Sequence, residues 1–327
     1  CCPPRMTVAL QRIRDDPQAI REGARLKGEE VPLDELLELD ARARALRTEV
    51  ENLRAEQRRG APKGRPSPAQ LEQLNALKQR VQLGEEELRG LDARLEDLLL
   101  YVPNPPHPSV PHGADESGNV TLRTWGEPAR FDFDPRPHYD LGDDLGIFDF
   151  ERAAKLSGAR FAVLRGAGAR LQRSLATFML DVATQQHGYT EIAPPYLVRR
   201  ECMVGTANLP KFEDDAFHVD DGLFLVPTAE VPLTNLYREE ILEGAQLPIA
   251  HCAFTPCFRR EAGSAGKDTR GYIRMHQFDK VELVRFVEPE TSLAQLDLLV
   301  SHAESVLQQL GLHYRVLLMC TGDMGFA

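Results

Sequence analysis

The chain has 327 residues, a hydrophobic content of 42% and a formal net charge of −11 at neutral pH. This length allows one large domain with a smaller one, and the apolar content is enough for a buried core, which excludes a wholly disordered chain. The acidic balance argues against nucleic-acid binding over the whole surface, so any such binding should come from a local basic patch.

The N-terminal residues and the cysteines indicate a cellular compartment. The chain begins C-C-P-P-R-M, which lacks the apolar core of a signal peptide, and the acid-rich stretch that follows does not suit a transit peptide. We interpret Met6 as a candidate start and residues 1–5 as an upstream extension. No apolar run reaches the roughly 18 residues that a membrane span needs. The six cysteines form no C-x-x-C pair, which argues against a zinc cage or a disulfide framework. The sequence therefore predicts a reduced, cytoplasmic protein that has no membrane segment and no metal site built from its own side chains.

Residues 33–102 show the clearest periodicity. Apolar residues recur at alternating spacings of three and four, the a/d pattern of a coiled-coil seam. The positions are Leu36, Leu39, Ala43, Leu46, Val50 and Leu53 in a first run, then Leu74, Leu77, Val81, Leu88, Leu91, Leu95, Leu98 and Val102, with Gly84 as the one lapse. Between the runs, R-R-G-A-P-K-G-R-P-S-P is rich in helix breakers. The pattern predicts an antiparallel helical hairpin, the helical arm, projecting roughly 40 Å.

Two interpretations of this arm are open, a dimerisation coiled coil and an arm that binds nucleic acid. The hairpin satisfies its own seam, and basic residues gather at its far end, where phosphate contacts would set affinity. These residues are Arg54, Arg58, Arg59, Lys63 and Arg65, against Glu56 alone. The distribution of charge favours the nucleic-acid arm.

A Pro-rich stretch, residues 103–138, predicts a linker between an N-terminal domain at 1–102 and a core at 139–327. Two histidines flanked by prolines, His107 and His112, fit an extended linker better than a metal site.

The first half of the core is predicted as a strand, a helix and an extended segment. The strand is expected over 157–166 and the helix over 169–187, with Leu171 and Phe178 on its apolar face. The extended segment at 188–198 contains Pro195. Taken alone, this arrangement is ordinary core structure.

The sequence L-F-L-V-P-T-A-E-V-P-L-T-N, residues 223–235, predicts a short strand followed by a helix that Thr228 opens. On this segment alone, Thr228 is an N-cap and Glu230 a favourable acid in the first turn.

Residues 255–282 predict two strands joined by a basic, Gly-rich loop. Alternation places Arg259 and Glu261 on one face of the first strand. On the second strand one face is polar, and it carries Arg274, His276, Phe278, Lys280 and Glu282. Taken one at a time, these residues fit equally well an exposed antiparallel hairpin with a solvated face of mixed charge. The combination also suits a nucleotide site, because arginines hold phosphates with forked hydrogen bonds and an aromatic ring can stack on a base.

The pattern F-R-x-E, a Gly-rich loop and then R-x-H-Q-F-x-K-x-E resembles motif 2 of the class II aminoacyl-tRNA synthetases in its seryl-tRNA synthetase form. The resemblance extends from about Met6 to the last residue and includes the helical arm, the Pro-rich linker and the T-A-E segment. It implies an α+β fold in which the N-terminal hairpin is followed by a core with an antiparallel β-sheet flanked by helices. The segment around Pro195 then resembles motif 1, which implies a homodimer.

The resemblance also implies the reaction and its participants. L-serine would be activated with ATP to seryl-adenylate and then transferred to tRNA(Ser), with charging of tRNA(Sec) left open. Mg²⁺ is expected with the triphosphate. The helical arm would bind the tRNA through the basic residues at its far end.

Roles for individual residues follow from the same resemblance. Arg259 and Glu261 would be catalytic. Serine would be held by Thr228, Ala229, Glu230, Arg259 and Glu282. ATP would be bound by Arg259, Arg260, Glu261, Arg274 and Phe278.

The chain stops at C-T-G-D-M-G-F-A, before the region that carries motif 3 in the family, so we expect the sequence to be C-terminally incomplete. Two other functions stay open. One is a catalytically inactive, truncated tRNA-binding fragment, which the missing motif 3 would favour. The other is a synthetase-like amino-acid:carrier-protein ligase, against which the intact arm argues.

Overall fold

The computed structural model describes residues 8–60, 67–262 and 270–326. The predicted tRNA-binding residues Lys63 and Arg65 lie outside these ranges, as does most of the Gly-rich loop. The described chain forms two compact units, one of residues 8–120 with 318–326 and the other of Thr121–Leu317. The predicted domain boundaries at 102 and 138 stay a prediction.

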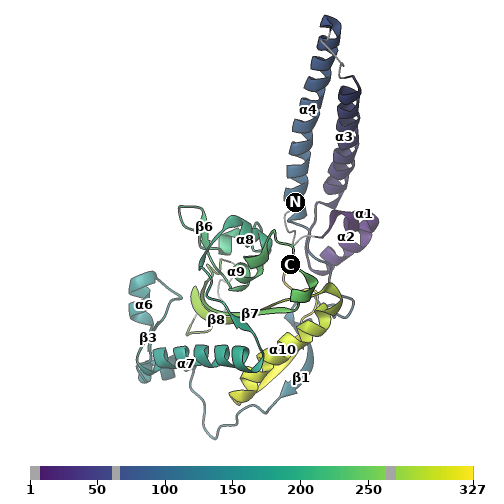
Figure 1. The fold of residues 1–327 in the computed structure, drawn as a ribbon. Helices are drawn as coiled ribbons and strands as arrows, with labels where there is room; N and C mark the ends of the chain where they lie inside the picture. The colour runs from purple at the N-terminus through teal and green to yellow at the C-terminus, as the bar shows by residue number, and fades with distance from the viewer. Residues whose placement is uncertain (1–7, 61–66, 263–269, 327) are drawn as a thin grey trace. The chain divides into compact units, whose positions relative to one another are not determined.

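The N-terminal unit is helical. Two short helices, α1 (Leu10–Asp15) and α2 (Pro17–Leu26), precede the long helices α3 (Leu33–Arg59) and α4 (Pro68–Leu99), which run side by side as a hairpin (Figure 1). Ser67 caps α4, since its side chain accepts the Gln70 N–H and the Gln70 side chain accepts the Ser67 N–H. The helical arm predicted from the seven-residue period is confirmed.

The seam of the arm is buried mainly near its base. There α1 and α2 pack with the two long helices in one cluster that contains Ile13, Ile20, Leu36 and Leu95. Along the arm, ion pairs join the helices at five places, Arg42–Glu87, Arg47–Asp92, Arg54–Glu85, Arg80–Glu49 and Arg94–Glu35. Exposed pairs of this kind contribute less than about 1 kcal/mol each, so the buried leucines carry most of the arm's stability.

Gly84, the lapse in the predicted seam, lies directly against Val50 of the facing helix α3. A Cβ added there would lie 2.6 Å from Cγ2 of Val50, which is itself 3% exposed. The glycine therefore belongs to the seam, because it makes room for Val50.

The second unit is built around a three-stranded sheet in the order β4–β7–β8. The long strands β7 (Ile249–Phe258) and β8 (Gln277–Phe286) pair antiparallel along their whole length, and β4 (Thr190–Glu191) joins β7 in parallel. Shorter antiparallel pairs are β5 (Leu197–Arg199) with β6 (Leu223–Leu225) and β2 (Phe148–Asp149) with β3 (Val163–Leu164). Strand β1 (Val120–Trp125) lies beside β9 (Tyr314–Leu318).

Helices cover this sheet (Figure 1). The longest are α7 (Ala167–Asp181), continued by a π-helical turn over Val182–Gln186, and α10 (Ser292–Gln309). Shorter helices are α5 (His138–Asp144), α6 (Phe150–Ser157), α8 (Arg200–Gly205) and α9 (Glu230–Thr234). Short 3₁₀ turns occur at Glu116–Gly118, Glu213–Asp215, Asn235–Tyr237, Gly244–Gln246 and Pro289–Thr291. The α+β class is thus confirmed. Among the described residues, none of the helices is both long and apolar enough to cross a membrane.

Three predicted strands are shorter in the structure. The strand expected over 157–166 is paired only at Val163–Leu164, because positive φ angles at Gly158 and Arg160 turn the chain first. The polar strand ends also stop early. The last ladder pair is Phe258 with Gln277, so Arg259 and Arg274 lie just beyond the strands that were predicted to carry them.

Candidate active site

One face of the β7–β8 ribbon carries an aromatic, a basic and an acidic side chain in succession. On β8, Phe278, Lys280 and Glu282 stand opposite Cys257, Thr255 and Ala253 of β7. The next residue on the other face, Leu283, packs with Tyr189 and Cys252 in an apolar cluster. The period of two therefore places the side chains of Phe278, Lys280 and Glu282 on one face, as predicted.

Thr228 joins this face from the segment before α9. Its hydroxyl donates to Oε2 of Glu282 at 2.5 Å and accepts from Nζ of Lys280 at 2.7 Å and from the Glu230 N–H at 3.3 Å. Lys280 and Glu282 also form an ion pair. Because Thr228 is only 6% exposed, the three side chains make a partly buried polar cluster, which we call the Thr228 cluster.

Arg259 leaves the end of β7 beside this cluster. Its N–H donates to the carbonyl oxygen of His276 at 2.9 Å, and its Nε donates to the carbonyl oxygen of Pro227 at 3.3 Å. The guanidinium carbon lies 5.2 Å from the ring centroid of Phe278, which is the range of a cation–π contact. An arginine and an aromatic ring expected to act on one nucleotide therefore lie side by side.

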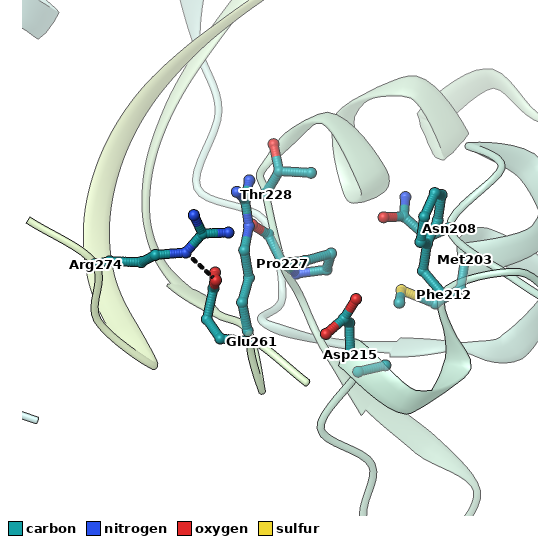
Figure 2. A pocket seen from close by; sticks show the side chains of 10 residues that line it. Met203, Asn208, Phe212, Asp215, Pro227, Thr228, Glu261 and Arg274 are labelled. Atoms are coloured by element: carbon teal, nitrogen blue, oxygen red, sulfur yellow. Dashed lines mark hydrogen bonds and ion pairs between the residues drawn. The ribbon is translucent and has the colours of Figure 1, made fainter. Parts of the chain in front are cut away.

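Glu261 is held in an unusual backbone conformation. Its φ is 54°, in the left-handed region where a residue with a side chain is strained by on the order of 1–3 kcal/mol. The carboxylate of Glu261 accepts a hydrogen bond from Nε of Arg274, drawn as a dashed line in Figure 2. Two residues separated by the Gly-rich loop are thus brought into direct contact.

These groups border a cavity of about 440 Å³. Its lining comes from Met203 of α8, from the segment between α8 and β6 (Asn208, Phe212, Asp215 and Ala216), from Pro227 and Thr228, and from Arg259, Glu261 and Arg274 (Figure 2). One side of the cavity is thus partly apolar and the other carries two arginines, an arrangement that suits an anionic ligand with an organic part.

Two pKa shifts in the site have clear causes. Glu230 is exposed as a residue, but loss of water around its carboxyl group raises its pKa, and the negative charge of Glu282 raises it further. Burial also raises the pKa of the Cys257 thiol, so that side chain is a neutral part of the core beneath the site.

Other predicted site residues are placed differently. The guanidinium of Arg260 lies 6.0 Å from the ring of Phe217, and Arg260 is not among the residues that line the cavity. Ala229 is fully buried and packs with Leu233 and Ala253, so its side chain supports the site from below. Both assignments stay predictions.

On the helical arm, Arg58 and Arg59 are exposed in the last turn of α3. Arg54 is paired with Glu85 of α4, an arrangement that leaves it less available to an external phosphate.

Lys280 and Asp215 are among the residues of the site that received no role from the sequence. The sequence placed Lys280 on the polar face of the second strand. Its position two residues before Glu282 was the signal that it would reach the Thr228 cluster. Asp215 had no such signal, because it acts on the end of β7 from a distant part of the chain.

The comparisons with known proteins agree with this architecture. The family model for the seryl-tRNA synthetase N-terminal domain matches residues 8–106, and the model for the class II tRNA synthetase core domain (G, H, P, S and T) matches residues 211–327. A serine–tRNA ligase of Geobacter sulfurreducens is 52% identical over 322 residues, which cover 96% of this chain and 76% of that protein. The chain belongs to the seryl-tRNA synthetase family.

Further relatives support the same assignment. A serine–tRNA ligase of Thermomicrobium roseum is 51% identical over 97% of this chain and 73% of its own length. Among solved structures, seryl-tRNA synthetase of Pyrococcus horikoshii, complexed with ATP, has a TM-score of 0.90 at 36% identity and covers 98% of this chain and 78% of that one. The cytoplasmic serine–tRNA ligase of Naegleria fowleri, in complex with AMP, has a TM-score of 0.82 at 27% identity, over 95% of this chain and 74% of that one.

Proposed function

We propose that this chain is a serine–tRNA ligase, which activates L-serine with ATP and transfers the seryl group to tRNA(Ser). The observation that carries the proposal is the Thr228 cluster, a compact set of hydrogen-bonding groups beside Arg259 and Phe278. The related structures with ATP and AMP support adenine nucleotides as the other ligands.

The Thr228 cluster suits a small polar amino acid. Carboxylates of Glu282 and Glu230 can accept from an ammonium group or a hydroxyl, and Thr228 can do either. A site of this kind discriminates against alanine, because an alanine side chain would leave buried polar groups without partners.

Arg259 and its neighbours would act on ATP. In the activation step a serine carboxylate oxygen attacks the α-phosphorus, the bond to the bridging oxygen breaks and pyrophosphate leaves. Arg259 would balance the charge that builds up on the α-phosphate, Phe278 would stack on the adenine, and Glu261 would orient the adenine end. Arg274 would reach the distal phosphates. Positioning and charge stabilisation supply most of the catalysis in such a step.

In the transfer step a hydroxyl of the tRNA 3′ terminus attacks the carbonyl carbon of seryl-adenylate, and AMP leaves. The helical arm would hold the tRNA through exposed basic residues such as Arg58 and Arg59. Its presence favours a tRNA over a carrier protein as the acceptor.

Mg²⁺ is expected to arrive with the triphosphate. Among the residues that the structure describes, no group of three or more His, Cys, Asp or Glu side chains could hold a metal ion. We therefore assign the ion no protein ligand and derive no step through it.

We further propose a homodimer in the cytoplasm. The apolar face of α7 supports the dimer, since Leu171 is 57% exposed in the single chain. The free cysteines Cys202, Cys252, Cys257 and Cys320 support a reducing compartment. Light scattering coupled to size-exclusion chromatography would measure the mass in solution.

Serine-dependent exchange of labelled pyrophosphate into ATP tests the activation step. Exchange with serine, but not with alanine or without an amino acid, would support the proposal, and transfer to a tRNA with a long variable arm would complete it. Binding of that tRNA without any exchange would instead favour a non-catalytic tRNA-binding fragment.

A further inference from the structure

Asp215 reaches the end of β7 from the 3₁₀ turn Glu213–Asp215, which lies between α8 and β6. Its carbonyl oxygen accepts the Arg260 N–H at 2.9 Å, and its Oδ1 accepts the Ala262 N–H at 2.7 Å. The two hydrogen bonds bracket Glu261, and the Asp215 side chain also lines the cavity (Figure 2).

These bonds replace strand pairing at the point where it ends. Beyond Phe258 and Gln277 one more backbone bond joins the two segments, from the Arg259 N–H to the His276 carbonyl oxygen. The N–H groups of Arg260 and Ala262 lie past this bond and need acceptors from elsewhere. Glu261 also has a positive φ, which persists only where the surroundings enforce it.

We propose that Asp215 is a positioning residue for the activation step. By clamping the backbone on both sides of Glu261, it keeps that carboxylate in contact with Arg274 and fixes the direction in which Arg259 leaves β7. The inference rests on the proposed function, since Arg259 and Glu261 are the groups that would act on ATP. The Thr228 cluster does not depend on the clamp, because Lys280 and Glu282 belong to β8 and Thr228 to the segment before α9.

Three variants separate this role from the alternatives. D215A removes the side-chain acceptor of the Ala262 N–H and leaves the backbone bond to Arg260 in place. D215N keeps an acceptor oxygen but removes the charge, and D214N is a matched control. Asp214 is the exposed neighbour in the same turn, and its side chain has no assigned hydrogen bond or ion pair among the described residues.

We expect D215A to lower kcat for serine-dependent ATP–pyrophosphate exchange about 10- to 100-fold, the usual effect of losing a charge-assisted hydrogen bond. The KM for serine should change less than about 3-fold, because the Thr228 cluster is intact. D215N should restore most of kcat, and D214N should match the unchanged protein. If D215N falls as far as D215A, the charge acts directly on substrate and the positioning role is wrong. If D215A behaves like D214N, Asp215 has no role.

Hydrogen–deuterium exchange of the peptide that contains residues 259–262 tests the clamp without catalysis. D215A should exchange faster there while the β8 peptide stays protected, and unchanged exchange would overturn the proposal. Should D215A fail to fold in a thermal melt, D215S replaces it, since the shorter side chain does not reach Ala262. If the unmodified protein shows no serine-dependent pyrophosphate exchange, only the proposed function is contradicted. The hydrogen–deuterium exchange measurement would still decide whether Asp215 holds residues 259–262 in place.

Discussion

The helical arm and the β7–β8 site are held together in different ways. In the arm, each turn of α3 meets an equivalent turn of α4, so leucines and ion pairs repeat along its length. In the site, the side chains predicted to act on ATP lie where the regular strand pairing ends. Arg259 and Glu261 follow the last ladder residue of β7, and Arg274 precedes the first ladder residue of β8. A regular scaffold tolerates single changes because its contacts are many, whereas an irregular end depends on a few particular bonds. The two regions should therefore respond to substitution very differently.

The largest effect is expected for R259A. Removing the guanidinium should lower serine-dependent ATP–pyrophosphate exchange on the order of 10²- to 10³-fold, the usual effect of losing one donor to a developing negative charge. Binding of tRNA(Ser), measured by filter retention, should stay unchanged because the arm is untouched.

R260A tests whether the neighbouring arginine, which the family resemblance assigns to ATP, takes part in the reaction. The Arg260 side chain points toward Phe217, so we expect a loss below about 5-fold, as for a substitution outside the reacting groups. If R259A and R260A lower the rate of ATP–pyrophosphate exchange equally, the geometry is contradicted and both arginines bind ATP.

The next effect concerns Glu230, whose pKa is raised by loss of water and by Glu282. E230Q should raise the KM for serine about 10-fold, because an ionised acceptor for the ammonium group is lost. In the unchanged protein the KM for serine should rise as pH falls through this raised pKa, and E230Q should flatten that dependence. A serine KM that is the same in both proteins from pH 5 to pH 8 would show that Glu230 does not touch the substrate.

The same shift fixes the sign of the effect on stability. A carboxyl group whose folded pKa is raised binds its proton more tightly when folded, so its charged form opposes folding at neutral pH and ceases to do so as pH falls through the folded pKa. E230Q should therefore unfold at a slightly higher temperature than the unchanged protein at pH 7. Thermal melts at pH 7 and pH 4.5 would show whether the difference shrinks at the lower pH.

A third effect should appear in the arm and spare the site. The double variant R58A/R59A should weaken tRNA(Ser) binding about 10-fold and reduce the slope of log affinity against log salt by roughly 1 to 2, as expected for two lost phosphate contacts. ATP–pyrophosphate exchange should not change. A double variant at Arg12 and Arg89 removes the same charge elsewhere in the N-terminal unit, and an equal loss of affinity there would argue against a contact at the end of the arm.

These differences also explain what the sequence could predict. The arm followed from a period that continues through helices of 27 and 32 residues, and strand parity placed Phe278, Lys280 and Glu282 on one face. The alternation of side chains between two faces holds only within paired strands. Glu261 and Arg274 lie outside the pairing, so the sequence could not predict their contact. The bond from Asp215 to the Ala262 N–H was invisible for a second reason. It uses a backbone donor 47 residues away, and no residue type marks such a partner.

Gly84 is a further case, since the sequence marks it only as a lapse in the hydrophobic period and says nothing of the space it leaves for Val50. The smallest expected effect concerns two glycines of α4. Replacing each by alanine should change the free energy of unfolding differently. At Gly84 a Cβ would meet buried Val50 at 2.6 Å, whereas at Gly90 nothing lies within 4 Å. Alanine gains about 1 kcal/mol of helix propensity at either site, but overpacking costs about 1–3 kcal/mol at the first alone.

G90A should therefore raise the free energy of unfolding by up to about 1 kcal/mol, and G84A should leave it unchanged or lower it by up to about 2 kcal/mol, as the clash offsets the propensity gain. Urea unfolding followed by circular dichroism at 222 nm would measure both, and neither variant should alter ATP–pyrophosphate exchange. If G84A is stabilised as much as G90A, the helices do not approach at residue 84 as closely as described, and the seam of the arm is looser than its leucine pattern implies.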